Sequence, residues 1–198
     1  MTGATNDDMP RVVVAEDEAI IRMDLCEMLQ EEGFDVVGEA ADGRQAVDLA
    51  REHHPDLVIL DIKMPGMNGI RAAEMITQER IAPVLILTAF SQRDLAAQAA
   101  QAGAMAYLVK PFQKSDLLPA IEIALERYGD VARLEGEVSE LAERLEARKL
   151  VERAKGLLVQ EGLNEAEAYR LMQRAAMDRG LKLGEVARLV LEGKLRDD

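Results

Sequence analysis

Five polar side chains at four places in the sequence have the chemistry of one reactive site. They are two adjacent carboxylates, a single carboxylate, a hydroxyl and an ammonium group: Glu16, Asp17, Asp61, Thr88 and Lys110. Carboxylates that lie close together raise one another's pKa unless a cation joins them. Oxygen ligands of this kind suit Mg²⁺, which binds one or two carboxylates and a phosphate and keeps several waters. A phosphoryl group on one carboxylate would then meet the cation, the hydroxyl and the ammonium group.

Each of the four places directly follows an apolar run that is typical of a buried strand. The runs lie at residues 11–15, 57–60, 84–87 and 106–109, and a further strand is expected at 34–39. Continuous apolar runs indicate strands covered on both faces, as in a parallel sheet. Because ligands bind beyond the carboxyl ends of such strands, the polar residues should meet at one edge of the sheet.

Helical spacing fills the segments between these strands. Helices are expected from Ile20 to a stop at Gly33, around residues 46–50, over 70–80, over 92–102 and from Ser115 onward. Ile20 and Leu118 are among the apolar residues expected to face the core. Strands that alternate with helices predict an α/β fold with a doubly wound, five-stranded parallel sheet.

The overall composition excludes several classes of protein. The chain of 198 residues has a formal net charge of −13, which argues against coating nucleic acid or anionic membrane along its whole length. The charge is uneven, since residues 148–198 carry a net charge of +2 and residues 1–147 a net charge of −15. No apolar run approaches the roughly 18–20 residues that a membrane helix needs.

The N-terminus and the cysteine content point to the cytoplasm. Residues 1–9 are polar and acidic, so they are expected to be a disordered tail and not a secretory signal. Cys26 is the single cysteine, which excludes an internal disulfide, and its apolar neighbours indicate a buried, inert thiol. We therefore expect a soluble cytoplasmic protein.

The strand ends carry the motifs of a known signalling domain. The segments VAEDE (14–18), LDIKMPGMNG (60–69), LTA (87–89) and YLVKPF (107–112) resemble the receiver domain of bacterial two-component response regulators. The resemblance covers residues 10–127 and implies a flavodoxin-like fold. It also implies that Asp61 accepts a phosphoryl group from a sensor histidine kinase. The chain is then a phosphoryl-accepting regulator and not an enzyme.

The same resemblance implies a metal site. Mg²⁺ is expected to be held by Asp17, by Asp61 and by the backbone carbonyl of Lys63, with Glu16 assisting through water. The family often has aspartate where this chain has Glu16. A direct contact between Glu16 and the metal is therefore left open.

The remaining strand-end residues are implied to hold the phosphoryl group and to respond to it. Lys110 is expected to pair with the phosphoryl oxygens. Thr88, next to Ala89, and Tyr107 are the expected switch pair, in which the hydroxyl moves to the phosphate and the ring turns inward. The family also tends to have a cis peptide bond before Pro111.

Beyond residue 127 the apolar residues follow heptad spacing. Steps of three and four residues separate five aliphatic side chains flanked mostly by glutamates: Val131, Leu134, Val138, Leu141 and Leu145. This pattern predicts a linking helix over residues 128–147 that continues the last receiver helix. Two interpretations remain open, a coiled coil with a second chain and an amphipathic helix packed on its own chain.

Three more helices are expected at residues 148–160, 165–177 and 183–191, the second opened by a capping box of Asn164 and Glu167. The segments RKLVERAKGLL (148–158), AYR (168–170), QRAAMDR (173–179) and VA (186–187) resemble the ANTAR domain. That domain is a three-helix RNA-binding module of antitermination regulators. The expected RNA contacts are seven basic residues and one aromatic residue: Arg148, Lys149, Arg153, Lys155, Tyr169, Arg170, Arg174 and Arg179.

Each of these RNA contacts has an alternative interpretation. Tyr169 is suited to stacking on an unpaired loop base, and it is equally suited to a core position between helices. The basic residues also fit a solvated face that balances nearby glutamates.

The two resemblances together indicate a phosphorylation-controlled regulator that acts by antitermination. Its expected partners are a sensor histidine kinase, RNA stem-loops and, upon phosphorylation, a second copy of the chain. Two alternatives are a DNA-binding regulator and a protein-interaction module without nucleic acid; a phosphatase-like enzyme is more remote. The expected domains are a tail (1–9), a receiver (10–127), a linking helix (128–147) and an RNA-binding domain (148–198).

Overall fold

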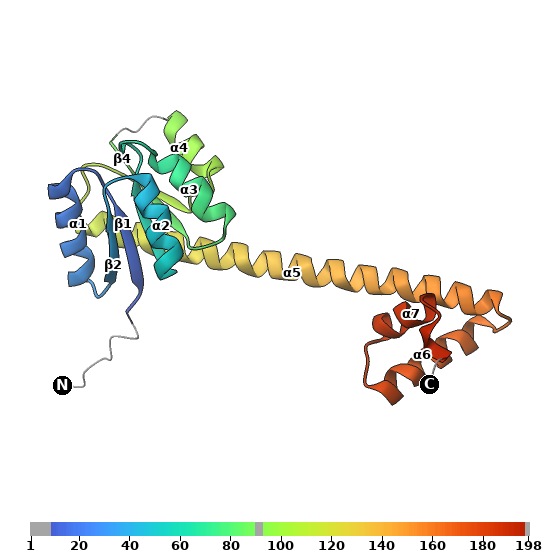
Figure 1. Ribbon diagram of the computed structural model, residues 1–198. Coiled ribbons are helices and arrows are strands. Elements are labelled where there is room, and N and C mark those ends of the chain that lie inside the picture. Colours follow the sequence, from blue (N-terminus) through green and yellow to red (C-terminus); the bar gives the residue numbers. More distant parts are fainter. Residues whose placement is uncertain (1–8, 90–92, 197–198) are drawn as a thin grey trace, which may run out of the picture. The chain divides into compact units, whose positions relative to one another are not determined.

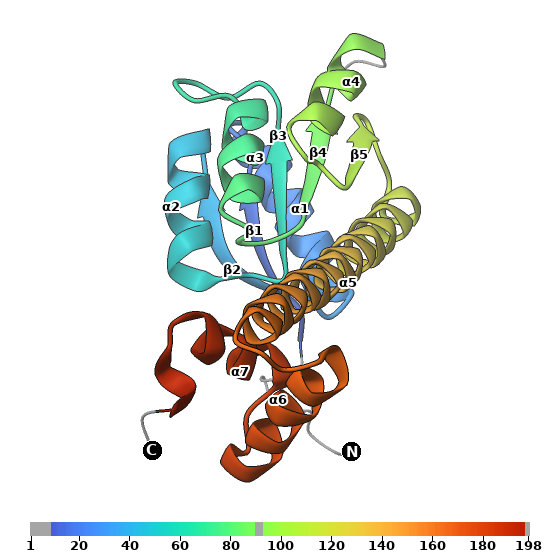
Figure 2. The same ribbon diagram turned by 90° about the vertical axis from the view of Figure 1, so that its right-hand side faces the viewer.

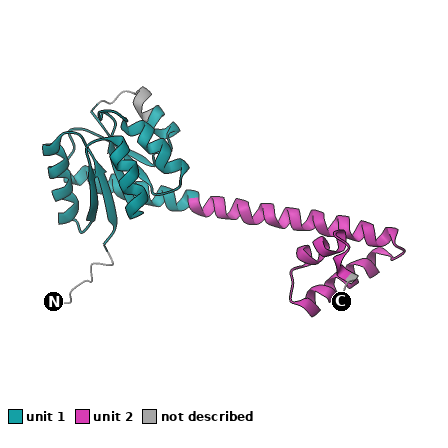
Figure 3. Cartoon of the chain, viewed as in Figure 1, with its two compact units in different colours: residues 1–131 teal, residues 132–198 magenta. Residues whose placement is uncertain are grey.

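The computed structural model describes residues 9–89 and 93–196 (Figure 1). The expected disordered tail, apart from Met9, lies outside the described residues, and so does Gln92 at the expected start of a helix. The chain divides into two compact units, residues 1–131 and residues 132–198 (Figure 3).

The first unit is built on a five-stranded sheet in the order β2-β1-β3-β4-β5, in which all neighbours are parallel. The strands are β1 (Arg11–Ala15), β2 (Asp35–Ala40), β3 (Leu57–Asp61), β4 (Val84–Thr88) and β5 (Ala106–Val109). Every residue of β3 and β4 is buried, as the continuous apolar runs predicted. The predicted doubly wound parallel sheet is confirmed.

Helices cover both faces of this sheet (Figure 2). They are α1 (Ala19–Glu31), α2 (Gly43–His53), α3 (Gly69–Gln78), α4 (Arg93–Gln101) and α5 (Lys114–Gln160). Residues of α2, α3 and α4 share one core cluster with every second strand residue, while α1 and the start of α5 pack on the opposite face. Successive strand side chains point to opposite faces, so each strand contributes to both cores.

Two residues that were expected in the core lie elsewhere. Ile20 is 73% exposed, because it stands five positions before the buried Leu25 and therefore about 140° around the helix from it. Leu118 is half-buried, whereas its neighbour Leu117 is fully buried and begins the inward stripe that continues at Ile121. Where two adjacent residues are both apolar, the sequence pattern does not show which of them faces the core.

Helix α5 runs without a break from Lys114 to Gln160. The last receiver helix, the expected linking helix and the first output helix are therefore one element. It ends where Gly162 adopts a left-handed backbone with φ of 105°. The five heptad residues of its middle part, which we call the seam (Val131, Leu134, Val138, Leu141 and Leu145), are 42–69% exposed.

The second unit packs the end of α5 against α6 (Glu165–Arg179), α7 (Leu183–Leu191) and a short 3₁₀ helix, η2 (Lys194–Arg196). The predicted capping box is present, since Asn164 Oδ1 accepts from Glu167 N and Glu167 Oε2 accepts from Asn164 N, both at 2.9 Å. Gly184 lets α7 lie close to α5, because a Cβ there would stand 3.0 Å from the Cβ of Ala147.

Within the described residues, no helix is long and apolar enough to cross a membrane.

Candidate functional site: an acidic pocket at the sheet edge

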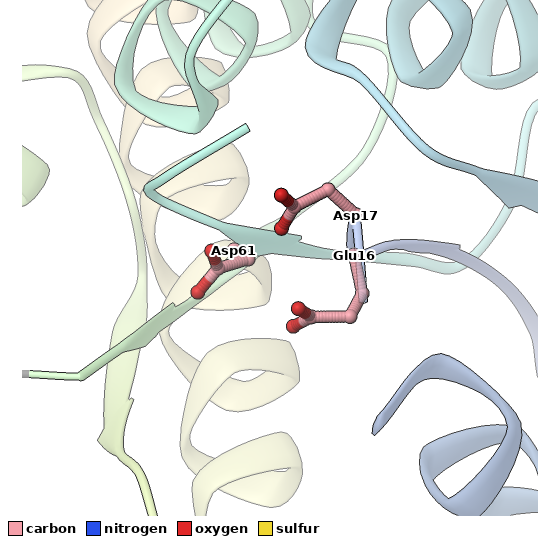
Figure 4. A group of neighbouring side chains, drawn as sticks. All are labelled: Glu16, Asp17 and Asp61. Carbon is pink, nitrogen blue, oxygen red and sulfur yellow. The ribbon is translucent and has the colours of Figure 1, made fainter. Parts of the chain in front are cut away.

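Three carboxylates meet at the carboxyl edge of the sheet (Figure 4). Glu16 and Asp17 directly follow β1, and Asp61 is the last residue of the adjacent strand β3. One oxygen from each of them lies within 4.8 Å of the others. Glu16 is fully buried, Asp61 is 5% exposed and Asp17 is exposed. The parallel register therefore brings together the acidic residues that the sequence predicted at strand ends.

The turn after β3 fixes the position of Asp61. Ile62 N donates to Leu87 O at 3.1 Å, and Gly69 N donates to Ile62 O at 3.0 Å. A Cβ on Gly69 would stand 2.0 Å from the carbonyl oxygen of Asp61, so only glycine fits at this close approach. Gly69 belongs to the motif quoted above, but the sequence alone did not assign it a role. The structure shows the reason for a glycine here, because the backbone at the start of α3 returns close to the end of β3.

Both carboxylate oxygens of Asp61 are engaged. Asp61 Oδ1 lies 2.9 Å from Lys110 Nζ, and Oδ2 accepts a hydrogen bond from Lys63 N at 3.0 Å. Lys110 Nζ also contacts Glu16 Oε2. These contacts hold the Asp61 carboxylate in one orientation. The Lys110–Pro111 peptide bond is cis, as expected for the family.

Burial and charge shift the pKa of two of these groups. Burial raises the pKa of the Glu16 carboxyl, and the neighbouring Asp61 acts in the same direction, while Lys110 opposes both. Burial alone would lower the pKa of Lys110, but hydrogen bonds to Glu16 and Asp61 outweigh it and raise that pKa. Lys110 therefore stays charged at neutral pH. Lys110 contacts two of the three clustered carboxylates, Glu16 and Asp61, and the excess of negative charge favours binding of a further cation.

A cavity of about 280 Å³ opens above Asp61. The residues that line the cavity lie at, or just after, the ends of β1, β3, β4 and β5. They are Asp17, Glu18, Asp61, Ile62, Lys63, Thr88, Ala89 and Lys110. Thr88 is 5% exposed at the end of β4. Tyr107 on β5 is 54% exposed and does not line this cavity.

The expected RNA contacts in the second unit fall into two groups. Several already have partners: Lys155 Nζ lies 2.9 Å from Glu152 and 3.5 Å from Glu165, Lys149 pairs with Glu146 at 2.7 Å, Arg170 donates to Ala166 O, and Arg179 donates to Leu195 O. Among the described residues, Arg148, Arg153 and Arg174 are exposed and make no ion pair. Tyr169 is 40% exposed, so the core interpretation of this ring holds only in part.

Comparison with known proteins defines the class. Residues 12–122 match the response regulator receiver domain, and residues 139–191 match the ANTAR domain. The chain belongs to the response regulators that join a receiver domain to an ANTAR domain.

One relative matches almost the whole chain, and others match its receiver part alone. The transcriptional regulatory protein PdtaR of Mycobacterium tuberculosis is 60% identical over 197 residues, which cover 97% of this chain and 96% of the relative. The chemotaxis protein CheY of Bacillus subtilis is 42% identical over 116 residues, covering 58% of this chain and 97% of CheY. The receiver domain of NarL from Mycobacterium tuberculosis superimposes with a TM-score of 0.57 at 32% identity, covering 60% of this chain and 97% of that one.

The contact at Gly69 yields a first prediction. Gly69→Ala should lower the free energy of unfolding by about 1–3 kcal/mol, because the new methyl group forces the Asp61 backbone to move. It should also slow labelling of Asp61 by acetyl phosphate. Gly129→Ala is the control, since a Cβ at Gly129 meets nothing within 4 Å. Equal urea midpoints for both variants, read by circular dichroism, would contradict the close approach.

Proposed function

We propose that this chain is a phosphorylation-controlled regulator in which Asp61 accepts a phosphoryl group from a sensor histidine kinase. The observation that carries the proposal is the Asp61 carboxylate, held between Lys110 and Lys63 N at the base of a cavity. An Asp61 oxygen attacks the phosphorus while the bond to the kinase histidine breaks, and the ring nitrogen keeps the electron pair. The protein carries the phosphoryl group and releases no organic product.

The donor set of the pocket fits Mg²⁺. We propose that Asp17, Asp61 and the Lys63 carbonyl hold the ion, while Glu16 acts through water. The contact of Glu16 with Lys110 supports this indirect role, because one oxygen of the Glu16 carboxylate already has a cationic partner. Bound Mg²⁺ would neutralise charge on the phosphoryl oxygens. Lys110, which lies 2.9 Å from Asp61, supplies a second positive charge.

The switch pair follows from the positions of Thr88 and Tyr107. Thr88 and Ala89 line the cavity at the end of β4, so the hydroxyl lies on the side where the phosphoryl group is added. Tyr107 stands on the neighbouring strand β5 and is 54% exposed, so its ring has an inward movement available. We propose that phosphorylation draws Thr88 and Lys110 toward Asp61 and that Tyr107 follows inward.

We further propose that the ANTAR unit binds RNA stem-loops and thereby favours antitermination. The support is the domain match together with three exposed arginines without ion pairs among the described residues, Arg148, Arg153 and Arg174. Lys155 also holds α5 and α6 together, since it links Glu152 of α5 to Glu165 of α6.

The exposed seam supports a phosphorylation-dependent homodimer. Its five aliphatic side chains keep heptad spacing and are 42–69% exposed in the described chain. Apolar residues at heptad positions are the surface that coiled-coil partners bury. Pairing two chains would present two RNA-binding modules together and raise avidity for paired hairpins. The acidic flanks of the seam oppose pairing in the unphosphorylated protein.

The acceptor is tested by labelling with acetyl phosphate. The wild type should incorporate stoichiometric phosphate only when Mg²⁺ is present, and Asp61→Asn should incorporate none, because the amide removes the nucleophilic oxygen at nearly constant volume. Phosphoprotein is measured by intact mass. Stoichiometric incorporation in Asp61→Asn would place the acceptor elsewhere.

The output is tested by titration of hairpin RNA and duplex DNA of equal length at several salt concentrations. Affinity for hairpins should fall as salt rises, and Arg174→Ala should weaken binding and flatten the salt slope by about one unit. Arg44→Ala on the receiver is the control. A preference for duplex DNA would favour the DNA-binding alternative, and absence of binding to both would favour a protein-interaction module.

The dimer is tested by sedimentation with and without a phosphoryl mimic. Phosphorylation should double the mass and raise affinity for paired hairpins by roughly 5–150-fold, the range of ordinary allosteric coupling. Leu141→Glu, which puts a charge in the seam, should abolish both effects, whereas Ser139→Glu beside the seam should not. An RNA gain that survives Leu141→Glu would assign the signal to unmasking of the output module.

A further inference from the structure

Gly156 lies in the interior of helix α5, and no contact with another described residue requires a glycine at this position. It lies four residues before the end of α5, so it is not a helix cap. Its φ is not left-handed, and a Cβ built on it would meet nothing within 4 Å. Glycine in a helix interior lowers stability by about 0.5–1 kcal/mol relative to alanine.

Other glycines of the second unit have visible reasons. Gly162 and Gly180 adopt left-handed backbones with φ of 105° and 63° at helix ends, and Gly184 faces Ala147 at close range. Gly156 shares neither feature. A cost that nothing in the described chain offsets points to a partner that must come closer to the helix than a side chain would allow.

The open space around Gly156 does not by itself identify that partner, because Gly129 and Gly136 have the same open space around them. The charged residues near Gly136 and near Gly156 differ, however. One turn before Gly136 lies Arg133, which is paired with Glu137 at 3.0 Å. One turn before Gly156 lies Arg153, which is exposed and makes no ion pair among the described residues.

The surface around Gly156 carries one unpaired cation. Arg153 lies one turn before Gly156 on the same side of α5 and makes no ion pair among the described residues. Lys149, two turns before it, is paired with Glu146 at 2.7 Å, and the Glu152 carboxylate is paired with Lys155 at 2.9 Å. Gln160, one turn after Gly156, adds an uncharged hydrogen-bonding group. An anionic partner complements the Arg153 guanidinium.

A second copy of the chain does not fit here. The heptad positions that continue the seam beyond Leu145 are Arg148, Glu152 and Lys155. Charged residues at successive core positions of a heptad repeat oppose coiled-coil pairing. The apolar seam therefore ends before it reaches Gly156.

We infer that the sugar–phosphate backbone of RNA crosses helix α5 at Gly156, with Arg153 on a phosphate beside the crossing. The inference rests on the proposed RNA-binding function and adds a contact that depends on shape. A helix surface without a Cβ admits the backbone directly, and the unpaired Arg153 guanidinium supplies the attraction. Gly156 sets how closely the strand approaches, so the site tolerates no added side chain.

The test compares Gly156→Ala with Gly136→Ala in the full-length protein. The probe is a pool of paired RNA stem-loops with randomised loops, titrated at one fixed salt. Both variants should melt at a slightly higher temperature, since each replaces an open helical glycine by alanine. Only Gly156→Ala should lose RNA affinity, by about tenfold or more, which corresponds to roughly 1.4 kcal/mol. Arg153→Gln should also weaken binding and reduce the salt slope by about one unit.

The outcomes separate this inference from the function on which it rests. Wild-type binding with unchanged affinity in Gly156→Ala would overturn the crossing at Gly156 and leave the RNA-binding function intact. Failure of the wild type to bind any stem-loop, with or without a phosphoryl mimic, would overturn both. Loss of affinity in Gly156→Ala together with an altered sedimentation coefficient would assign the glycine to contact between two chains and overturn the RNA crossing.

Discussion

The contact of one ammonium group with two carboxylates is the interaction around which the receiver unit is arranged. Lys110 at the end of β5 reaches past β4 to Asp61 of β3 and to Glu16 after β1. Buried carboxylates at this spacing repel one another unless a cation lies among them. The parallel strand order, the turn after β5 and the close return of α3 at Gly69 all serve to hold these charges together. The Asp61 carboxylate is thereby held in place where it lines the cavity at the sheet edge.

Much of this arrangement could be predicted from residue pattern. Continuous apolar runs identify buried parallel strands, and strand ends then place Asp61, Thr88 and Lys110 at one edge. The pattern fails where the reach of a side chain or the choice between neighbours decides the outcome. The sequence pattern does not show that Lys110 pairs with Glu16 as well as with Asp61. It also does not show that Lys155 pairs with two glutamates. Spacing ranks residues by type and position, whereas contacts depend on rotamers and on which helices become neighbours.

The two units use charge in opposite ways. The receiver concentrates three carboxylates at the sheet edge and buries two of them, an arrangement that favours a bound cation. The output unit scatters positive charge over exposed helix faces and neutralises some of it by local pairs, such as Lys149 with Glu146. Local pairing lowers the number of free cations without removing them. Three unpaired cations that remain, Arg148, Arg153 and Arg174, are exposed among the described residues.

The exposed position of Tyr107 gives the molecule a built-in optical probe. The chain contains no tryptophan and three tyrosines, so tyrosine alone accounts for its intrinsic fluorescence. One phenol, Tyr107, lies on the edge strand β5, which Lys110 directly follows. Tyr128 reaches from α5 to the carbonyl of Arg80, and Tyr169 is 40% exposed on α6. Replacing two of them by phenylalanine leaves a single emitter at a known place. Events at the sheet edge, along the long helix and on the output module can thus be followed separately without any attached dye.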